Sequence, residues 1–260
     1  MLSSYFTNGE ISENIANNFI KHRNEYNYPN VRLRASKKPT KIKISDSLWA
    51  ETDESKLDKP TDLELDEYHF SLLSSSDPDE NLLGTSSVIF WGYYTFKRNY
   101  ALNKLKWHLE GYRSKLATST STINQKITLI KNEPNNGLAM SHLSDISQLG
   151  SIPFASKVIT FLRPETAGIY DNQIHKGLVG CDWYKKSLLN TRIGAARYKN
   201  VQNGYDRWCS FLSQFATDLN NGIAEGQNWR WHDSSGVIST WRAVDVERAL
   251  FNYFKTEKNI

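Results

Sequence analysis

The stretch "IPFASKVITFLRPETAGIYDNQIHKGL", residues 152 to 178, contains two apolar segments separated by a proline and a glycine. Apolar residues recur at helical spacing in the first segment, and Pro164 cannot continue a helix, so the pattern predicts a helix over 154–163. Gly168 provides a bend in the segment that follows. Asp171 then stands at the expected N-cap of a second helix. The stretch therefore predicts a helix, a reversal of the chain and a second helix.

The same stretch carries a lysine and an aspartate that the reversal can bring to one level. Lys157 lies in the first helix, which rises roughly 9 Å from there to Arg163. Residues 164–170 span up to roughly 20 Å when extended, which is enough to return Asp171 to the level of Lys157. Each residue alone also has an ordinary explanation, as a solvated lysine and as a helix cap. Together they predict an amine and a carboxylate on one wall of a site.

The remainder of the C-terminal two thirds is also helical in pattern. Apolar and aromatic residues recur on successive turns from residue 82 onward, ending with "WRAVDVERALFNYFK" at 241–255. No internal repeat of 20 to 50 residues is visible, which argues against a solenoid. The sequence predicts a mostly α protein, a multi-helix bundle whose helical domain spans 82–260.

The first 81 residues differ in composition from the rest and are expected to pack on the helical body. Residues 9–26 predict an amphipathic helix. Residues 30–44 alternate apolar and basic side chains, which fits a short basic hairpin, an extended arm on a phosphate backbone, or a strand edge protected by lysines. Residues 45–80 contain twelve Asp or Glu against two Lys. This acidic stretch predicts a loop or a poorly ordered connector.

Composition places the chain among ordinary globular proteins. It has 260 residues, 39% of them hydrophobic and 23% charged, and its net charge of +4 favours a polyanionic partner only mildly. The two cysteines, Cys181 and Cys209, have no metal-binding spacing, so neither zinc nor an iron–sulfur cluster is expected, and no cofactor is suggested. The N-terminal residues do not resemble a signal peptide, and no apolar run is long enough to span a membrane, so we expect a cytoplasmic protein.

The segment "SKVITFLRPETAGIYDNQI", residues 156–174, resembles the catalytic segment of the helix-hairpin-helix DNA glycosylases, most closely their 8-oxoguanine DNA glycosylase-like branch. The run "VDVERALFNYF" at 244–254 is similar to the final helix of bacterial members of that branch. The likeness covers about residues 82–255 and places the hairpin and catalytic segment at 146–178. The hairpin is degenerate, because Pro153 and Phe154 stand where a second glycine would help to hold a DNA phosphate.

The resemblance implies that the protein cleaves the bond between a DNA base and its sugar, leaving an abasic site. A carboxylate near the anomeric carbon stabilises the positive charge that develops there, and this role falls to Asp171. Lys157 has two possible roles. As a neutral amine it would attack the same carbon, form a Schiff base and later cut the strand, or it would only position a phosphate or the carboxylate.

Base excision requires the nucleotide to leave the duplex and to stack against aromatic side chains. Trp91, Tyr94 and Arg98 are expected on one helix face, with a core role for the aromatics as the alternative. The remaining candidates for base or DNA binding are Phe154, His175 one turn beyond Asp171, and Trp241, which is expected on the last helix with Glu247. Basic residues that would follow a DNA backbone are Lys97, Lys104, Lys106, Arg113, Lys115, Lys185, Lys186, Arg192, Arg197 and Lys199.

The substrate is a separate question. The altered hairpin and the many aromatic residues favour a bulky base, glucosylated hydroxymethylcytosine in phage DNA, and hence a role in antiviral defence. The alternative is base-excision repair of 8-oxoguanine. Two alternatives are not enzymes. One is a non-catalytic helical DNA-binding module, and the other is a helical interaction protein that binds no nucleic acid. DNA is the expected partner, with no membrane and no obligate protein partner.

Overall fold

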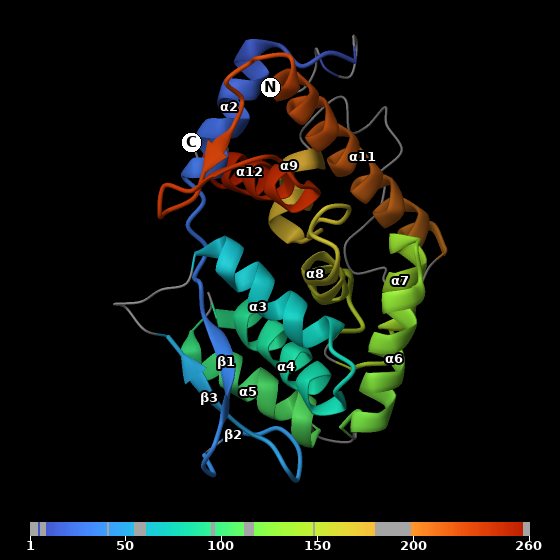
Figure 1. Ribbon diagram of the computed structural model, residues 1–260. Coiled ribbons are helices and arrows are strands. Elements are labelled where there is room, and N and C mark those ends of the chain that lie inside the picture. Colours follow the sequence, from blue (N-terminus) through green and yellow to red (C-terminus); the bar gives the residue numbers. More distant parts are fainter. Residues whose placement is uncertain are drawn as a thin grey trace. The chain divides into compact units, whose positions relative to one another are not determined.

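The computed structural model describes residues 5, 9–40, 42–54, 61–94, 97–111, 117–147, 149–179 and 199–256. Most of these residues are helical, and a small antiparallel sheet is formed by strands between residues 32 and 53 (Figure 1). The prediction of a mostly α protein is therefore confirmed. The chain forms two compact units, a central unit of residues 28–162 and a terminal unit that combines residues 1–27 with 163–260.

The central unit is built around one buried helix, α4. Every residue from Asn81 to Gly92 in this helix is buried, which is typical of a helix packed on all sides. Helices α3, α5, α6 and α8 and strand β1 all contact it. The elements of this unit are β1 (Arg32–Ser36), β2 (Ile42–Lys43), β3 (Trp49–Asp53), α3 (Asp62–Ser74), α4 (Pro78–Tyr94), α5 (Arg98–Glu110), α6 (Thr120–Asn132), α7 (Asn136–His142) and α8 (Ile152–Leu162).

The sheet confirms an extended β segment in the basic stretch but not a hairpin between its two strands. Strand order is β1-β3-β2, so the two strands from the basic stretch pair with β3 and not with each other. Strand β3 comes from the acidic stretch, and its Asp53 carboxylate lies 2.9 Å from Arg32 Nε and 2.6 Å from Arg34 Nε. Leu33 and Ala50 are fully buried, so both strands also supply apolar side chains. Opposite charges across the strands and a shared apolar face explain the pairing.

The expectation of a loop over residues 45–80 is wrong for a second reason. Helix α3 lies in this stretch and begins with a capping box, in which Thr61 and Glu64 satisfy each other's backbone amides. Its apolar residues Leu65, Leu72 and Leu73 are buried. Residue 82, the expected start of the helical domain, lies inside α4, and the chain passes from one unit to the other at 27/28 and 162/163.

The terminal unit packs three longer helices together. Helix α12 contacts α2, α9 and α11, and a two-stranded sheet precedes it. The amphipathic helix expected over residues 9–26 is confirmed as α2, with Ser12 as its N-cap. The elements are α2 (Glu13–Asn24), α9 (Asn172–Val179), α11 (Lys199–Ala224), β4 (Trp231–His232), β5 (Ile238–Ser239) and α12 (Ala243–Thr256).

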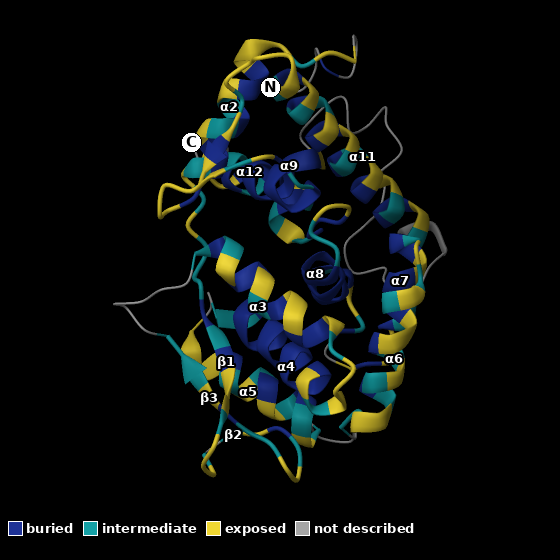
Figure 2. Ribbon diagram, in the orientation of Figure 1, coloured by how far each residue is buried: buried dark blue, intermediate teal, exposed yellow. Residues whose placement is uncertain are grey.

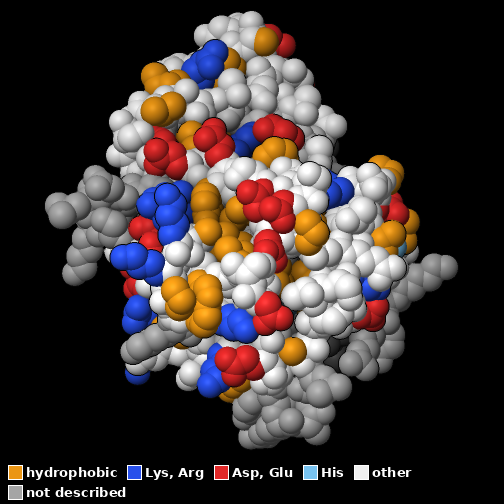
Figure 3. All heavy atoms as spheres, turned by 60° about the horizontal axis from the view of Figure 1, so that its bottom comes forward, with side chains coloured by type: hydrophobic (Ala, Val, Ile, Leu, Met, Phe, Trp, Pro, Cys, Tyr) orange, Lys and Arg blue, Asp and Glu red, His pale blue; other side chains and the backbone are white. Residues whose placement is uncertain are grey.

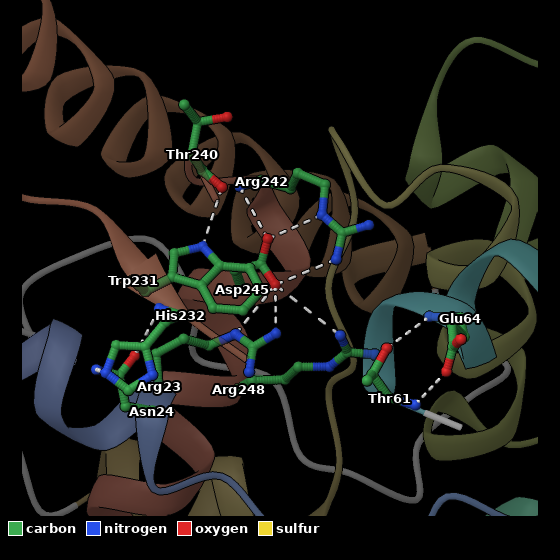
Figure 4. A network of polar contacts seen from close by, with 10 residues as sticks. All are labelled: Arg23, Asn24, Thr61, Glu64, Trp231, His232, Thr240, Arg242, Asp245 and Arg248. Atoms are coloured by element: carbon green, nitrogen blue, oxygen red, sulfur yellow. Dashed lines mark hydrogen bonds and ion pairs between the residues drawn. The ribbon is translucent and has the colours of Figure 1, made fainter. Parts of the chain in front are cut away.

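A carboxylate shared by three arginines lies in the core of the terminal unit (Figure 4). Asp245 in the first turn of α12 accepts hydrogen bonds from Arg23 Nη2 at 2.9 Å and Arg242 Nε at 2.8 Å, and Arg248 Nη1 lies 3.9 Å away. Burial alone would raise the pKa of Asp245, but the guanidinium groups of Arg242 and Arg23 lower it to about 2. This network joins α2 to α12.

No helix within the described ranges has the length and apolar character needed to cross a membrane.

Candidate active site

The Lys157 side chain is enclosed by aromatic rings of the central unit. It is only 5% exposed, and its Nζ donates a hydrogen bond to the Pro153 carbonyl at 3.2 Å. The same Nζ lies 5.2 Å from the ring centroid of Phe154 and 6.0 Å from that of Trp91. A Cβ at Gly92 would come within 3.1 Å of Lys157 Cδ, so the missing side chain there makes room for the lysine stem.

Helix α8 confirms the first of the two predicted helices. It runs from Ile152 to Leu162, one residue short of the expected end, and Pro164 follows. Pro153 is accepted because it occupies the first turn, where a backbone N–H has no helical partner. All residues of α8 except Pro153 are buried (Figure 2). Lys157 is therefore not a solvated lysine on a helix surface.

The segment that leads to Asp171 is fixed within the terminal unit by hydrogen bonds to its carbonyl groups. Tyr205 OH donates to Gly168 O at 3.1 Å, and Trp208 Nε1 donates to Ile169 O at 3.2 Å. The backbone amide of Val244 donates to Pro164 O at 3.1 Å. Side chains of α11 and the start of α12 thus hold the backbone immediately before Asp171.

Gly168 is needed for close packing. A Cβ at this position would lie 2.2 Å from Leu212 Cδ1 and 3.0 Å from Glu247 Cβ. Its φ is not positive, since the described glycines with positive φ are Gly9, Gly111, Gly226 and Gly236. The role that the structure gives Gly168 is therefore to let α11 and α12 approach the segment.

We expect Gly168→Ala to lower the free energy of unfolding by about 1–3 kcal/mol, because the new methyl group has no space. Urea unfolding monitored by circular dichroism measures this. In a Leu212→Ala background the same change should cost clearly less, since the main clashing atom is gone. An equal cost in both backgrounds would contradict the steric explanation.

Asp171 is the N-cap of α9, as predicted. Its Oδ1 accepts hydrogen bonds from the backbone amides of Gln173 at 2.9 Å and Ile174 at 3.1 Å. Its Oδ2 accepts none from the residues that the structure describes, and the side chain is partly exposed. One carboxylate oxygen is thus anchored at a helix N-terminus, where a negative charge is stabilised, while the other is not used in this cap.

His175 lies one turn further along α9. Its Nδ1 lies 3.2 Å from the Tyr170 hydroxyl, and partial burial lowers the pKa of the imidazole. Tyr170 itself is buried and forms an edge contact with Trp208, with ring centroids 5.7 Å apart. Partial burial therefore favours the neutral imidazole, and the ring lies beside a residue of the segment that carries Asp171.

The expected common face of Trp91, Tyr94 and Arg98 is wrong. Helix α4 ends at Tyr94, and Arg98 begins a different helix, α5. The Tyr94 hydroxyl donates to Glu54 Oε2 at 2.8 Å, and Arg98 Nε lies 2.6 Å from Glu54 Oε1. Trp91 is buried against Phe161, with ring centroids 5.1 Å apart. The Trp91 ring is the one beside Lys157 Nζ, at 6.0 Å from its centroid.

Trp241 was expected on the last helix but precedes it, since α12 begins at Ala243. It is buried, and its indole Nε1 donates to Trp229 O at 2.6 Å. Asn220 on α11 bonds to both its backbone amide and its carbonyl, each at 2.9 Å. These contacts make Trp241 part of the core of the terminal unit.

The structure thus gathers Lys157, Phe154 and Trp91 in the central unit, and Asp171 and His175 in the terminal unit. The pairing of Lys157 with Asp171 stays a prediction. Of the expected basic track, Arg113, Lys115, Lys185, Lys186, Arg192 and Arg197 lie outside the described residues, as does the side chain of Lys199. On the face drawn in Figure 3, basic and acidic side chains are interspersed.

Two features of the central unit are not among the residues expected from the sequence. One is Gly92, whose importance depends on contacts between α4 and α8 that are distant in sequence. The other is a group of aromatic rings around Lys104, formed by Tyr93, Tyr100 and Trp107. The spacing of Tyr100, Lys104 and Trp107 by four and three residues was a visible signal of one helix face.

Metal-binding groups and reactive thiols are not found in the part of the chain that the structure describes. No cluster of three or more His, Cys, Asp or Glu residues suited to a metal occurs there. Cys209 is buried, and burial raises the pKa of its thiol to about 12, so it is not a reactive thiolate. Cys181 lies outside the described residues.

No protein-family model matches the chain, and neither a curated protein nor a solved structure is significantly similar to it. The resemblance to the helix-hairpin-helix glycosylases therefore stays a prediction that depends on the segment from Lys157 to Asp171.

Proposed function

We propose that the protein is a DNA glycosylase that removes a modified base by cleaving its N-glycosidic bond. The observation that carries the proposal is the state of Asp171. Its Oδ1 is fixed by two amides of α9, and its Oδ2 accepts no hydrogen bond within the described ranges. A carboxylate held in this way needs little reorganisation to face a developing positive charge. Because the surrounding segment resembles a glycosylase catalytic segment, we assign this positive charge to the sugar of the nucleotide that loses its base.

The chemistry follows from the bond that breaks. As the base leaves, positive charge develops on the sugar ring, and a nearby carboxylate lowers the energy of that state. Water then adds at the anomeric carbon, which leaves an abasic site. The hydrogen bonds from Tyr205 and Trp208 to the carbonyl groups before Asp171 hold the backbone there and so help to fix the position of the carboxylate.

The contacts of Lys157 favour a positioning role over a nucleophilic one. Its amine donates to the Pro153 carbonyl and lies beside the rings of Phe154 and Trp91, so these contacts hold the amine in one position. An amine held in this way is suited to positioning a DNA phosphate or the carboxylate, whereas a nucleophile must be able to reach the anomeric carbon. We therefore propose that the reaction stops at the abasic site.

This role predicts that borohydride will not trap the wild-type protein on DNA with a preformed abasic site. Lys157→Gln removes the charge at similar volume, and we expect it to slow base release by about 10- to 100-fold through lost positioning. Gel electrophoresis of protein–DNA adducts and of released base measures the two effects. A trapped adduct that disappears in Lys157→Gln would assign the lysine as a Schiff-base nucleophile.

The substrate is tested with duplexes that differ in one base. One carries glucosylated hydroxymethylcytosine, one 8-oxoguanine and one unmodified cytosine, and alkaline cleavage after incubation reveals abasic sites. We propose the glucosylated base as substrate and hence a role against phages with such DNA. Cleavage of the 8-oxoguanine duplex alone would favour base-excision repair. Absence of abasic sites in all duplexes, with DNA binding retained, would support a non-catalytic DNA-binding module.

A further inference from the structure

Helix α5 presents a lysine among three aromatic rings. Lys104 Nζ lies 4.1 Å from the ring centroid of Trp107, 5.2 Å from that of Tyr100 and 5.5 Å from that of Tyr93. Tyr93 belongs to the end of α4, and the other three residues belong to α5. We call these four residues the α5 aromatic cluster. The proposed base-release reaction does not use it.

The α5 members of the cluster lie on one face of the helix. Tyr100, Lys104 and Trp107 follow one another at spacings of four and three residues, which places them on one stripe, and Lys97 is the N-cap of the helix. Tyr100 is 42% exposed, and Lys104 and Trp107 are partly exposed. The residues one position further along, Ala101, Leu105 and His108, are buried. The stripe therefore borders the core and is itself partly exposed.

The rings are held in fixed positions by one another. Tyr93 and Tyr100 meet edge to face with centroids 5.6 Å apart, and Tyr93 stacks on Phe154 at 4.2 Å with an interplanar angle of 25°. Phe154 is the ring beside Lys157. An aromatic run thus extends, within the central unit, from Lys157 to the exposed Tyr100. Rings that are already ordered lose little conformational entropy on binding.

The charge of this surface is unbalanced. Neither Lys97 nor Lys104 forms an ion pair with any carboxylate in the residues described, whereas Lys106 lies 3.6 Å from Glu110. Two lysines beside stacked rings complement a ligand that combines negative charge with flat aromatic groups. Single-stranded DNA has both, because its bases expose π faces next to phosphates. An acidic peptide lacks the flat groups, and a duplex hides them.

We propose that the α5 aromatic cluster, with Lys97, is a binding site for single-stranded DNA. Bases stack on Tyr100 and Trp107, and phosphates contact Lys97 and Lys104. The proposed site goes beyond base release, because it binds DNA that is not base-paired. It depends on the protein binding DNA but does not depend on Asp171 being catalytic.

The test is fluorescence anisotropy of a labelled oligothymidylate with the full chain at two salt concentrations. Oligothymidylate contains no modified base, so binding is measured apart from chemistry. We expect salt-dependent binding, weakened about tenfold or more by Tyr100→Ala and by Trp107→Ala, since each removes a stacking platform. Tyr100→Phe keeps the ring and should bind like the wild type. Lys104→Gln should weaken binding and reduce its salt dependence.

Phe70→Ala is the matched control, because Phe70 is 46% exposed and belongs to α3 in the same unit. It should bind as the wild type does, and circular dichroism should show that all variants are folded. Unchanged affinity in both Tyr100→Ala and Trp107→Ala would overturn the proposal, as would polyglutamate competing as strongly as oligothymidylate. Binding through the cluster without any base release would support it while rejecting the glycosylase. Base release together with unchanged affinity in Tyr100→Ala and Trp107→Ala would support the glycosylase and overturn the single-stranded DNA site.

Discussion

Replacing Asp171 with asparagine is expected to reduce base release by about 10³-fold or more while leaving the fold intact. Asparagine is as good an N-cap as aspartate, so its side-chain oxygen will still accept the amides of Gln173 and Ile174. The negative charge is lost, and with it the stabilisation of a positively charged sugar. The change thus separates the capping role of this residue from the catalytic role that we propose.

The measurement combines single-turnover base release with urea unfolding. Stability should change by less than about 0.5 kcal/mol, because the cap is retained. Asp233→Asn is the matched control, since Asp233 Oδ1 accepts the backbone amides of Ser235 at 2.9 Å and Val237 at 3.0 Å in the same unit. It makes the same chemical change at another turn and should leave base release unaffected. Full activity in Asp171→Asn would remove the aspartate from the mechanism.

Local signals predicted the region around Asp171 correctly. The apolar spacing of α8, the stop at Pro164 and the cap at Asp171 each depend on residues within a few positions of one another. The prediction of a loop over the acidic stretch, residues 45–80, was wrong because the structure there depends on residues that are distant in sequence. Strand β3 is stabilised by Arg32 and Arg34, which lie 15 to 21 residues earlier in the chain, and charge composition alone contains no information on that partner.

The same distinction applies to the candidate site. A cap such as Asp171 is recognised from its neighbours, whereas Trp91, Tyr94 and Arg98 were grouped by assuming one uninterrupted helix. The break between α4 and α5 places Tyr94 and Arg98 beside Glu54 and leaves Trp91 with Lys157. The space for the Lys157 stem depends on Gly92 of another helix. Such contacts between distant helices are set by packing and cannot be read from periodicity.

The largest stability effect is expected from Asp245→Asn in the terminal unit. The carboxylate is fully buried and is shared by Arg23, Arg242 and Arg248. Removing its charge leaves the guanidinium groups of the buried network without their common partner, which costs about 3–5 kcal/mol in comparable sites. Asp53→Asn is the control, because Asp53 also contacts two arginines but Arg34 is half exposed. That change should cost about 1 kcal/mol or less.

The pH dependence of unfolding gives a sharper test of Asp245. Its pKa falls from an ordinary 3.8 to about 2 in the folded protein, so the folded state favours the ionised carboxylate. The resulting stabilisation, on the order of 2 kcal/mol, is fully present above pH 4 and is lost as the pH falls toward 2. Asparagine does not titrate, so the stability difference between wild type and Asp245→Asn should shrink over that interval. A difference that stays constant from pH 7 to pH 2 would show that the arginines do not act on this carboxylate through its charge.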